Sequence, residues 1–153
     1  MNIRIQPAAK NDLKAILQLQ KECYQTEAEI YNDFTISPLT QDLESLENDF
    51  DSQTILKAES DRKIVASVRG FRQNETCCIG RLIVHPDVQN LGIGQKMIKA
   101  IETAFPQCKR FELFTGFRSE KNLYLYQKLG YREFRREKAN TNLTLIFMEK
   151  WVR

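Results

Sequence analysis

The chain has 153 residues, of which 42% are hydrophobic and 28% charged, and its formal net charge is +3. This length and balance are typical of one globular domain and exclude disordered, collagen-like and low-complexity chains. No apolar run is long enough to span a membrane, and the small charge gives no indication of nucleic-acid binding. We therefore expect a single domain over residues 1–153 that has neither a membrane nor a nucleic acid as a partner.

The cysteines and the first residues indicate a reduced, cytoplasmic protein. Cys23, Cys77, Cys78 and Cys108 show no CxxC spacing, and His85 is the only histidine. Neither a disulfide framework nor a metal site is expected from this set. The chain also starts without the apolar run of a secretion signal.

Hydrophobic periodicity predicts the elements of the first half of the chain. Alternating apolar residues predict a strand over residues 3–6, and helical spacing predicts helices over 11–24 and 37–50. Residues 27–37 show no clear period and are expected to form a loop. Three strands follow, over residues 53–59, 64–72 and 76–84, with a turn over 60–63 between the first two.

The second half alternates helices and strands. We expect a helix over about 94–105, a strand over 110–115, a helix over 119–129 closed by Gly130, and strands over 131–136 and 143–151. The order β-α-α-β-β-β-α-β-α-β-β predicts a mixed α/β domain. Its sheet is expected to start antiparallel, with helices crossing over later.

A loop with two glycines joins the strand that ends at Val84 to the following helix. Gly92 and Gly94 would leave free backbone N–H groups near the positive end of the helix dipole, an arrangement that binds phosphates. The loop is not a P-loop, because Gln95 follows Gly94, and not a dinucleotide fingerprint, because Met97 replaces the third glycine. A tight turn without a ligand is the alternative.

Val84, Pro86, Gln89, Gly92 and Gly94 together resemble the acetyl-CoA-binding motif of the GNAT superfamily of N-acetyltransferases. The resemblance implies that the loop amides hold the CoA pyrophosphate. It also implies that the preceding strand pairs with the pantetheine arm, with one N–H polarising the thioester carbonyl. The cofactor-binding residues implied here are Leu82, Ile83, Val84, Gln89, Asn90, Leu91, Gly92, Ile93, Gly94 and Gln95.

The helix expected over 119–129 places Tyr126 on its apolar face and Tyr124 on the opposite face. Residues 125–131 resemble the GNAT pattern Leu-Tyr-x-Lys-Leu-Gly-Phe. This resemblance implies that Tyr126 lies near the CoA sulfur and acts as the general acid that protonates the leaving thiolate. A phenol stays protonated at neutral pH and can supply that proton. A core tyrosine without a catalytic role is the alternative.

Two further assignments depart from the family pattern. The family's asparagine seven residues before the tyrosine is Ser119 here, so Ser119, Asn122 or both are expected to contact the cofactor together with Tyr126. The alternative for Asn122 is a hydrogen bond to a neighbouring loop. The family's strand-end glutamate is Phe114 here, and Glu112 on the same strand face is the candidate base. Otherwise a water chain deprotonates the amine.

In the fold that this chain resembles, the segment 27–34 borders the acceptor site. Its carboxylates and aromatic rings suit a cationic amine, and the candidate substrate contacts are Glu29, Tyr31 and Phe34. A solvated acidic loop is the alternative. The basic segment 131–142 is typical of an edge strand that charge protects from aggregation.

The resemblance covers nearly the whole chain and implies the GNAT acyltransferase fold. This fold has a central, mostly antiparallel twisted sheet with a splayed parallel strand pair, flanked by about four helices. The implied activity is acetyl-CoA-dependent N-acetylation of a primary amine, with a small or amino-acid-like acceptor favoured. The alternatives are a catalytically silent acyl-CoA-binding sensor or docking module, and an enzyme acting on protein lysines or N-termini. Both a monomer and a homodimer remain open.

Overall fold

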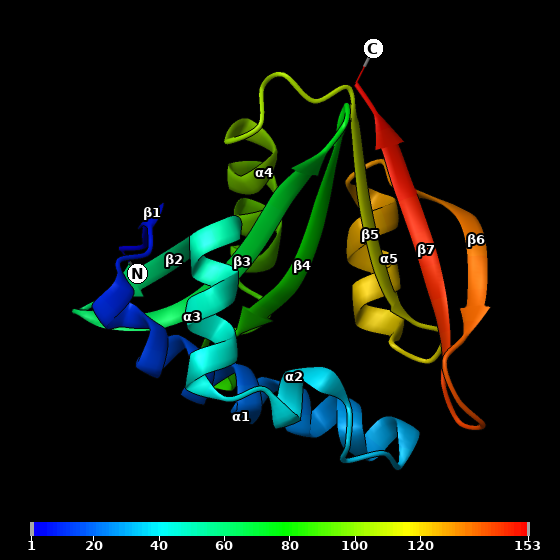
Figure 1. Ribbon diagram of the computed structural model, residues 1–153, viewed down its shortest axis with the longest axis horizontal. Coiled ribbons are helices and arrows are strands. Elements are labelled where there is room, and N and C mark those ends of the chain that lie inside the picture. The colour runs from blue at the N-terminus through cyan, green and yellow to red at the C-terminus, as the bar shows by residue number, and fades with distance from the viewer. Residues whose placement is uncertain (1, 153) are drawn as a thin grey trace.

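A single mixed sheet of seven strands organises the computed structural model, which describes residues 2–152 (Figure 1). Its strand order is β1-β2-β3-β4-β5-β7-β6, and only β4 and β5 pair in parallel. The strands are β1 (Arg4–Pro7), β2 (Thr54–Ser60), β3 (Lys63–Gln73), β4 (Thr76–Val84), β5 (Arg110–Gly116), β6 (Arg132–Lys138) and β7 (Thr144–Trp151).

Helices cover both faces of the sheet. They are α1 (Leu13–Tyr31), α2 (Ser37–Thr40), α3 (Leu43–Ser52), α4 (Ile93–Thr103) and α5 (Glu120–Lys128), with 3-10 turns at Lys10–Asp12 and Pro86–Val88. In Figure 1, α1 and α3 lie in front of the sheet, whereas α4 and α5 lie behind it. No helix within residues 2–152 combines the length and the apolar character that a membrane span requires. The predicted mixed α/β class, with its mostly antiparallel sheet and one parallel pair, is confirmed.

The single helix predicted over residues 37–50 is wrong, because this segment forms two helices, α2 and α3. The described residues therefore contain five α-helices instead of the expected four. The chain breaks between α2 and α3 because Asp42 takes an extended conformation and caps α3. Its side chain accepts a hydrogen bond from the backbone N–H of Ser45 at 2.8 Å. The break leaves Gln41 at the junction of the two helices, with its side chain free to bond across the sheet face.

The loop predicted over residues 27–37 is also wrong in its first part, because α1 continues to Tyr31. Ala28 and Tyr31 are buried at 0% and 4% exposure, so the last turn of the helix packs against the domain although its segment shows no clear apolar period. The helix ends at Asn32, whose left-handed φ of 47° forms the C-cap.

The sheet opens between β4 and β5. Register pairs join Thr76 to Arg110, Cys77 to Phe111 and Cys78 to Glu112, and no further pair follows. Figure 1 shows the two strands diverging beyond this point, with α1 crossing the open end. Residues 79–84 of β4 consequently have a partner strand on the β3 side alone, and the edge that faces β5 is unpaired.

A bulge in β4 redirects one side chain. Gly80 pairs with Arg69 and Ile83 with Ser67, so two residues, Arg81 and Leu82, lie opposite one residue of β3. Arg81 takes a left-handed φ of 52° at this point. Strict alternation would place Arg81 with Cys77 on the α4 face of the sheet, but the bulge turns it to the face covered by α1 and α3, where it reaches the α2–α3 junction.

Candidate functional site

The turn after β4 is built around glycines in the positions that the motif predicts. Gly92 is the N-cap of α4 and has a φ of 81°, a conformation that favours glycine. Gly94 lies one residue into the first turn, where an added Cβ would lie 3.3 Å from the side chain of Leu125. The N-terminus of α4 is therefore held close to α5, and an alanine at position 94 would require the Leu125 side chain to shift by a few tenths of an ångström.

The backbone N–H groups of this turn are available to a ligand. Within residues 2–152, no hydrogen bond takes its donor from the backbone of residues 90–95. The first turn of α4 contains no acid, and the exposed Lys96 adds a positive charge. Free amides at a helix N-terminus suit an anion such as a pyrophosphate, so this turn fits the group that the motif implies.

The predicted cofactor residues lie along this turn and the open edge of β4. Leu82 and Val84 face α4, whereas Ile83 is buried on the α1 side. The Gln89 amide donates to the carbonyl oxygen of Val84 at 3.1 Å, which ties the turn to the strand end. The remaining members differ in exposure: Leu91 is 57% exposed and Ile93 is in the core.

Tyr126 has the environment of a proton donor. It is 5% exposed on the core face of α5, while Tyr124 on the opposite face is 69% exposed. Burial raises the pKa of Tyr126 above its usual value of 10, and neighbouring Tyr24 and Glu27 act in the same direction. No side-chain hydrogen bond within residues 2–152 engages its hydroxyl group. The phenol therefore keeps its proton at neutral pH.

Glu27 of α1 is a candidate site residue that the sequence placed in the acceptor segment 27–34 but did not single out. Its Oε2 accepts a hydrogen bond from the Ser119 hydroxyl at 2.7 Å, and its Oε1 one from the Asn122 amide at 3.4 Å. The structure thus joins Ser119 and Asn122, both predicted to contact the cofactor, to α1. The signal was the helical spacing of Tyr24, Glu27 and Tyr31, which shares one helix face once α1 extends to Tyr31.

The structure does not bring Glu112, the predicted base, to this cluster. Glu112 pairs with Arg110 at 2.7 Å and lies opposite Cys78, where β4 and β5 are still joined. Its neighbour Leu113 packs into the same core as Tyr126, so the Glu112 side chain lies on the other face of the strand.

Of the three predicted substrate contacts, one lies in the cluster. The hydroxyl group of Tyr31 lies 2.7 Å from the Ser119 Oγ and accepts a hydrogen bond from the backbone N–H of Arg118 at 2.9 Å. Glu29 is exposed on α1, and Phe34 beyond the helix is 49% exposed. Tyr31 therefore fixes α1 against the start of α5.

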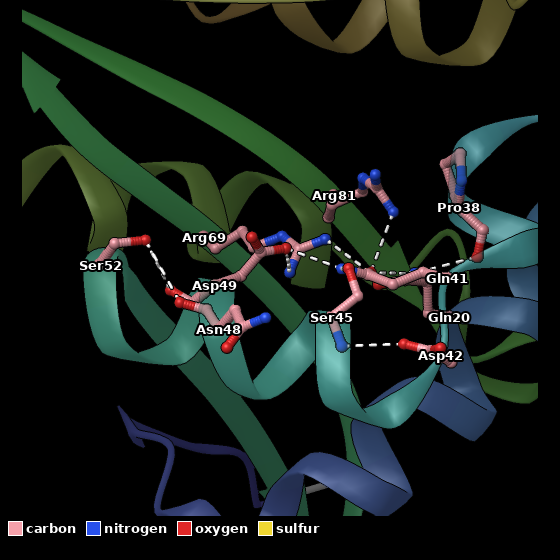
Figure 2. A network of polar contacts seen from close by, with 10 residues as sticks. All are labelled: Gln20, Pro38, Gln41, Asp42, Ser45, Asn48, Asp49, Ser52, Arg69 and Arg81. Atoms are coloured by element: carbon pink, nitrogen blue, oxygen red, sulfur yellow. Dashed lines mark hydrogen bonds and ion pairs between the residues drawn. The ribbon is translucent and has the colours of Figure 1, made fainter.

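A second polar cluster lies between the sheet and the α2–α3 junction (Figure 2). Arg69 on β3 is 5% exposed and pairs with Asp49 of α3 at 3.0 Å. The side-chain oxygen of Gln41 accepts hydrogen bonds from Arg69 at 3.1 Å and from Arg81 at 3.3 Å. Burial and the nearby Arg81 charge lower the pKa of Arg69 to about 10. Two arginines therefore meet on the α1 face of the sheet beside β4.

Comparison with solved structures shows a shared fold over the full length. The PaiA N-acetyltransferase of Thermoplasma acidophilum in complex with coenzyme A has a TM-score of 0.82 at 18% identity, covering 99% of both chains. YncA, a putative acetyltransferase of Salmonella typhimurium with acetyl-CoA, has a TM-score of 0.79 at 17% identity, covering 100% of this chain and 95% of that one.

The ribosomal-protein-S18-alanine N-acetyltransferase of Escherichia coli has a TM-score of 0.81 at 12% identity, covering 99% of this chain and 94% of that one. A search of curated protein sequences found no match. The model of the acetyltransferase (GNAT) family matches residues 13–131, which include the glycine turn, the open strand edge and Tyr126. The chain therefore belongs to the GNAT acetyltransferase family.

Proposed function

We propose that this protein is an N-acetyltransferase that uses acetyl-CoA and transfers the acetyl group directly to a primary amine of a small molecule. One observation supports the proposal above the others. The free amides of residues 90–95 and the buried Tyr126 hydroxyl lie on the two helices, α4 and α5, that Gly94 brings into contact at the open edge of β4. Solved structures of similar fold hold coenzyme A and acetyl-CoA.

In this proposal the turn and the strand edge bind, and two side chains move protons. The amides of residues 90–95, with Lys96 beside them, would hold the pyrophosphate. The unpaired edge of Leu82, Ile83 and Val84 would hold the pantetheine arm, and an N–H from it would stabilise the developing oxyanion. When bound, acetyl-CoA supplies an activated thioester carbonyl.

The proton transfers of this reaction require one general acid and one general base. A C–N bond forms between amine and acetyl carbon, and the C–S bond breaks. The ammonium form of the acceptor loses two protons, of which one goes to solvent and one replaces the proton that Tyr126 donates to the thiolate. Glu27, rather than Glu112, is our candidate for the base, because it is half-buried near Tyr126 and is oriented by Ser119.

Calorimetric titration with acetyl-CoA and CoA, beside a thiol-release assay over amines, amino acids and peptides, tests the proposal. We expect binding of both nucleotides and thiol release with a small amine. Binding without release by any acceptor would favour an acyl-CoA sensor. Release with peptides alone would favour an enzyme that acts on proteins. If neither nucleotide binds, the glycine turn is only a structural turn.

A further inference from the structure

Arg81 forms no ion pair of its own within residues 2–152, although the Asp49 carboxylate that pairs with Arg69 also acts on its charge. The side chain is half-buried, and one of its terminal nitrogens donates to Gln41 at 3.3 Å. No ion pair in the described part of the chain includes Arg81. A guanidinium group has five N–H donors in a planar fork, so most of its donors remain available.

The acceptors around Arg81 are already used. The carboxylate of Asp49 accepts from Arg69 at 3.0 Å and from the Gln41 amide at 2.7 Å. The side-chain oxygen of Gln41 accepts from Gln20 at 3.0 Å in addition to the two arginines. Two guanidinium groups thus share a single carboxylate, which leaves an excess positive charge. Figure 2 shows the other guanidinium nitrogens of Arg81 turned away from Gln41 and the rest of the cluster.

An unbalanced, half-buried arginine is unfavourable unless something compensates it. The chain also adopts an uncommon backbone conformation to place it there, because Arg81 is the bulge residue with a φ of 52°. Local backbone strain of this kind gathers at functional sites. A bound anion would supply both the missing charge and the missing acceptors for the guanidinium fork.

Arg81 lies near α1, the helix that carries Glu27, because Arg81 and Gln20 of α1 both donate to the side-chain oxygen of Gln41. Tyr24 follows Gln20 by one turn of α1; burial raises the pKa of Tyr24 to about 12, and the Arg81 guanidinium opposes this rise. Tyr24 and Glu27 lie one turn apart on α1, and both raise the pKa of Tyr126. The same face of α1 therefore leads from Gln20, which shares Gln41 with Arg81, past Tyr24 to the Glu27 carboxylate near Tyr126.

We propose that Arg81 binds a carboxylate of the acceptor, and that the acceptor is a free amino acid whose amino group lies toward Glu27. The inference rests on the proposed function and narrows it. A lysine side chain or an N-terminus of a protein has no free carboxylate beside its amine, so neither would use Arg81. Arg81 thereby selects the acceptor and takes no part in moving protons.

The test compares acceptors that differ only at the carboxylate. Thiol release is measured for the L-amino acids and for their α-carboxamides, with the wild-type protein, Arg81→Met and Arg72→Met. Arg72 is a matched control, since its side chain is exposed and bonds the carbonyl of Asn74 at the β3–β4 turn. We expect the wild-type KM for the best amino acid to lie at least about 10-fold below that for its carboxamide.

Arg81→Met should raise the KM for the amino acid about 10- to 100-fold and leave the KM values for the carboxamide and for acetyl-CoA unchanged. Arg72→Met should match the wild type. Equal use of amino acids and carboxamides by the wild type would overturn the proposal. So would an Arg81→Met variant that impairs both acceptors alike, because that result indicates a structural role.

Two further measurements keep the outcome clear. If Arg81→Met does not fold, Arg81→Lys keeps the charge and loses the fork, and it should raise the amino-acid KM alone. If the wild type binds acetyl-CoA but releases no thiol, calorimetric titration of the CoA-loaded protein with amino acids tests the carboxylate subsite separately. Amino-acid binding that Arg81→Lys weakens supports the carboxylate subsite although the transferase proposal fails. No amino-acid binding overturns the subsite.

Discussion

Tyr126 on α5 and Glu27 on α1 lie near one another on two different helices. Glu27 contributes to the raised pKa of Tyr126, and its carboxylate is held by Ser119 and Asn122 at the start of α5. In the proposed mechanism, this protonated phenol and oriented carboxylate would form the acid and base pair that direct acetyl transfer to an amine requires. The chemistry of the site can therefore be tested at single side chains.

Tyr126→Phe should lower kcat by about 10²-fold with little change in the Kd for acetyl-CoA, because it removes a proton donor and little else. Steady-state thiol release and calorimetry measure the two quantities. Tyr124→Phe on the exposed face is the matched control and should behave as the wild type. Because the pKa of Tyr126 is raised and its protonated form is active, wild-type kcat should not fall at pH values up to about 10. An unimpaired Tyr126→Phe variant would remove this residue from the mechanism.

Substituting the two candidate bases, Glu27 and Glu112, should have opposite effects on kcat. Glu27→Gln keeps the size of the side chain and removes the basic group, so kcat should fall about 10- to 100-fold near neutral pH, with a smaller loss at high pH where the amine is already deprotonated. Glu112→Gln should leave kcat nearly unchanged, since Glu112 pairs with Arg110 on the other strand face. Profiles of kcat against pH for both variants check this, and the reverse pattern would restore Glu112.

The candidate acid was predictable from the sequence, whereas the candidate base was not. Tyr126 lies in a short local pattern, and the helical period alone gives its face. Glu27 and Arg81 become site residues only through contacts far away in the chain, with α5 and with the α2–α3 junction. Composition and spacing within one segment contain no information about such contacts.

The spacing of apolar residues along the sequence predicted most helices and strands well. It missed the features that depend on packing between distant segments. The strand expected over residues 76–84 has those bounds in the structure, and the α4 and α5 boundaries shift by one or two residues. The last turn of α1 lies in a segment without a clear apolar period and forms because Ala28 and Tyr31 are buried. The bulge at Arg81 depends on the register with β3, which no pattern within β4 specifies.

The glycine turn before α4 can be tested for CoA binding by a substitution at its N-cap residue, Gly92. Gly92→Ala should weaken CoA binding about 10-fold or more, because φ near 81° is unfavourable for alanine and the loop amides would reorient. The strain should also lower the free energy of unfolding by about 1 kcal/mol.

Gly130→Ala is the matched control, because Gly130 has a φ of 98° at the end of α5 and lies outside the turn. It should lose similar stability by chemical denaturation and keep the wild-type Kd for CoA. Equal weakening of CoA binding in both variants would show that the loss is a general effect of instability.

In the whole molecule, the two halves of the sheet are joined by few contacts along the open parallel pair. Three register pairs connect β4 to β5, and beyond them α1 links the halves through its bonds to Val84 at the end of β4 and to Ser119 at the start of α5. A ligand that occupies the unpaired edge of β4 and the turn before α4 would add contacts between the halves. Its binding should therefore stabilise the domain as a whole.

Acetyl-CoA at about 100 times its Kd should stabilise the native state by about 2.7 kcal/mol, which for a domain of this size raises Tm by about 5–10 °C. Thermal unfolding with and without the nucleotide measures this shift. Amide hydrogen exchange should slow in residues 79–84 and 90–95, because the ligand covers groups that have no partner strand or helix. Protection confined to other segments, with the same rise in Tm, would place the nucleotide elsewhere and contradict the site built on the open edge of β4.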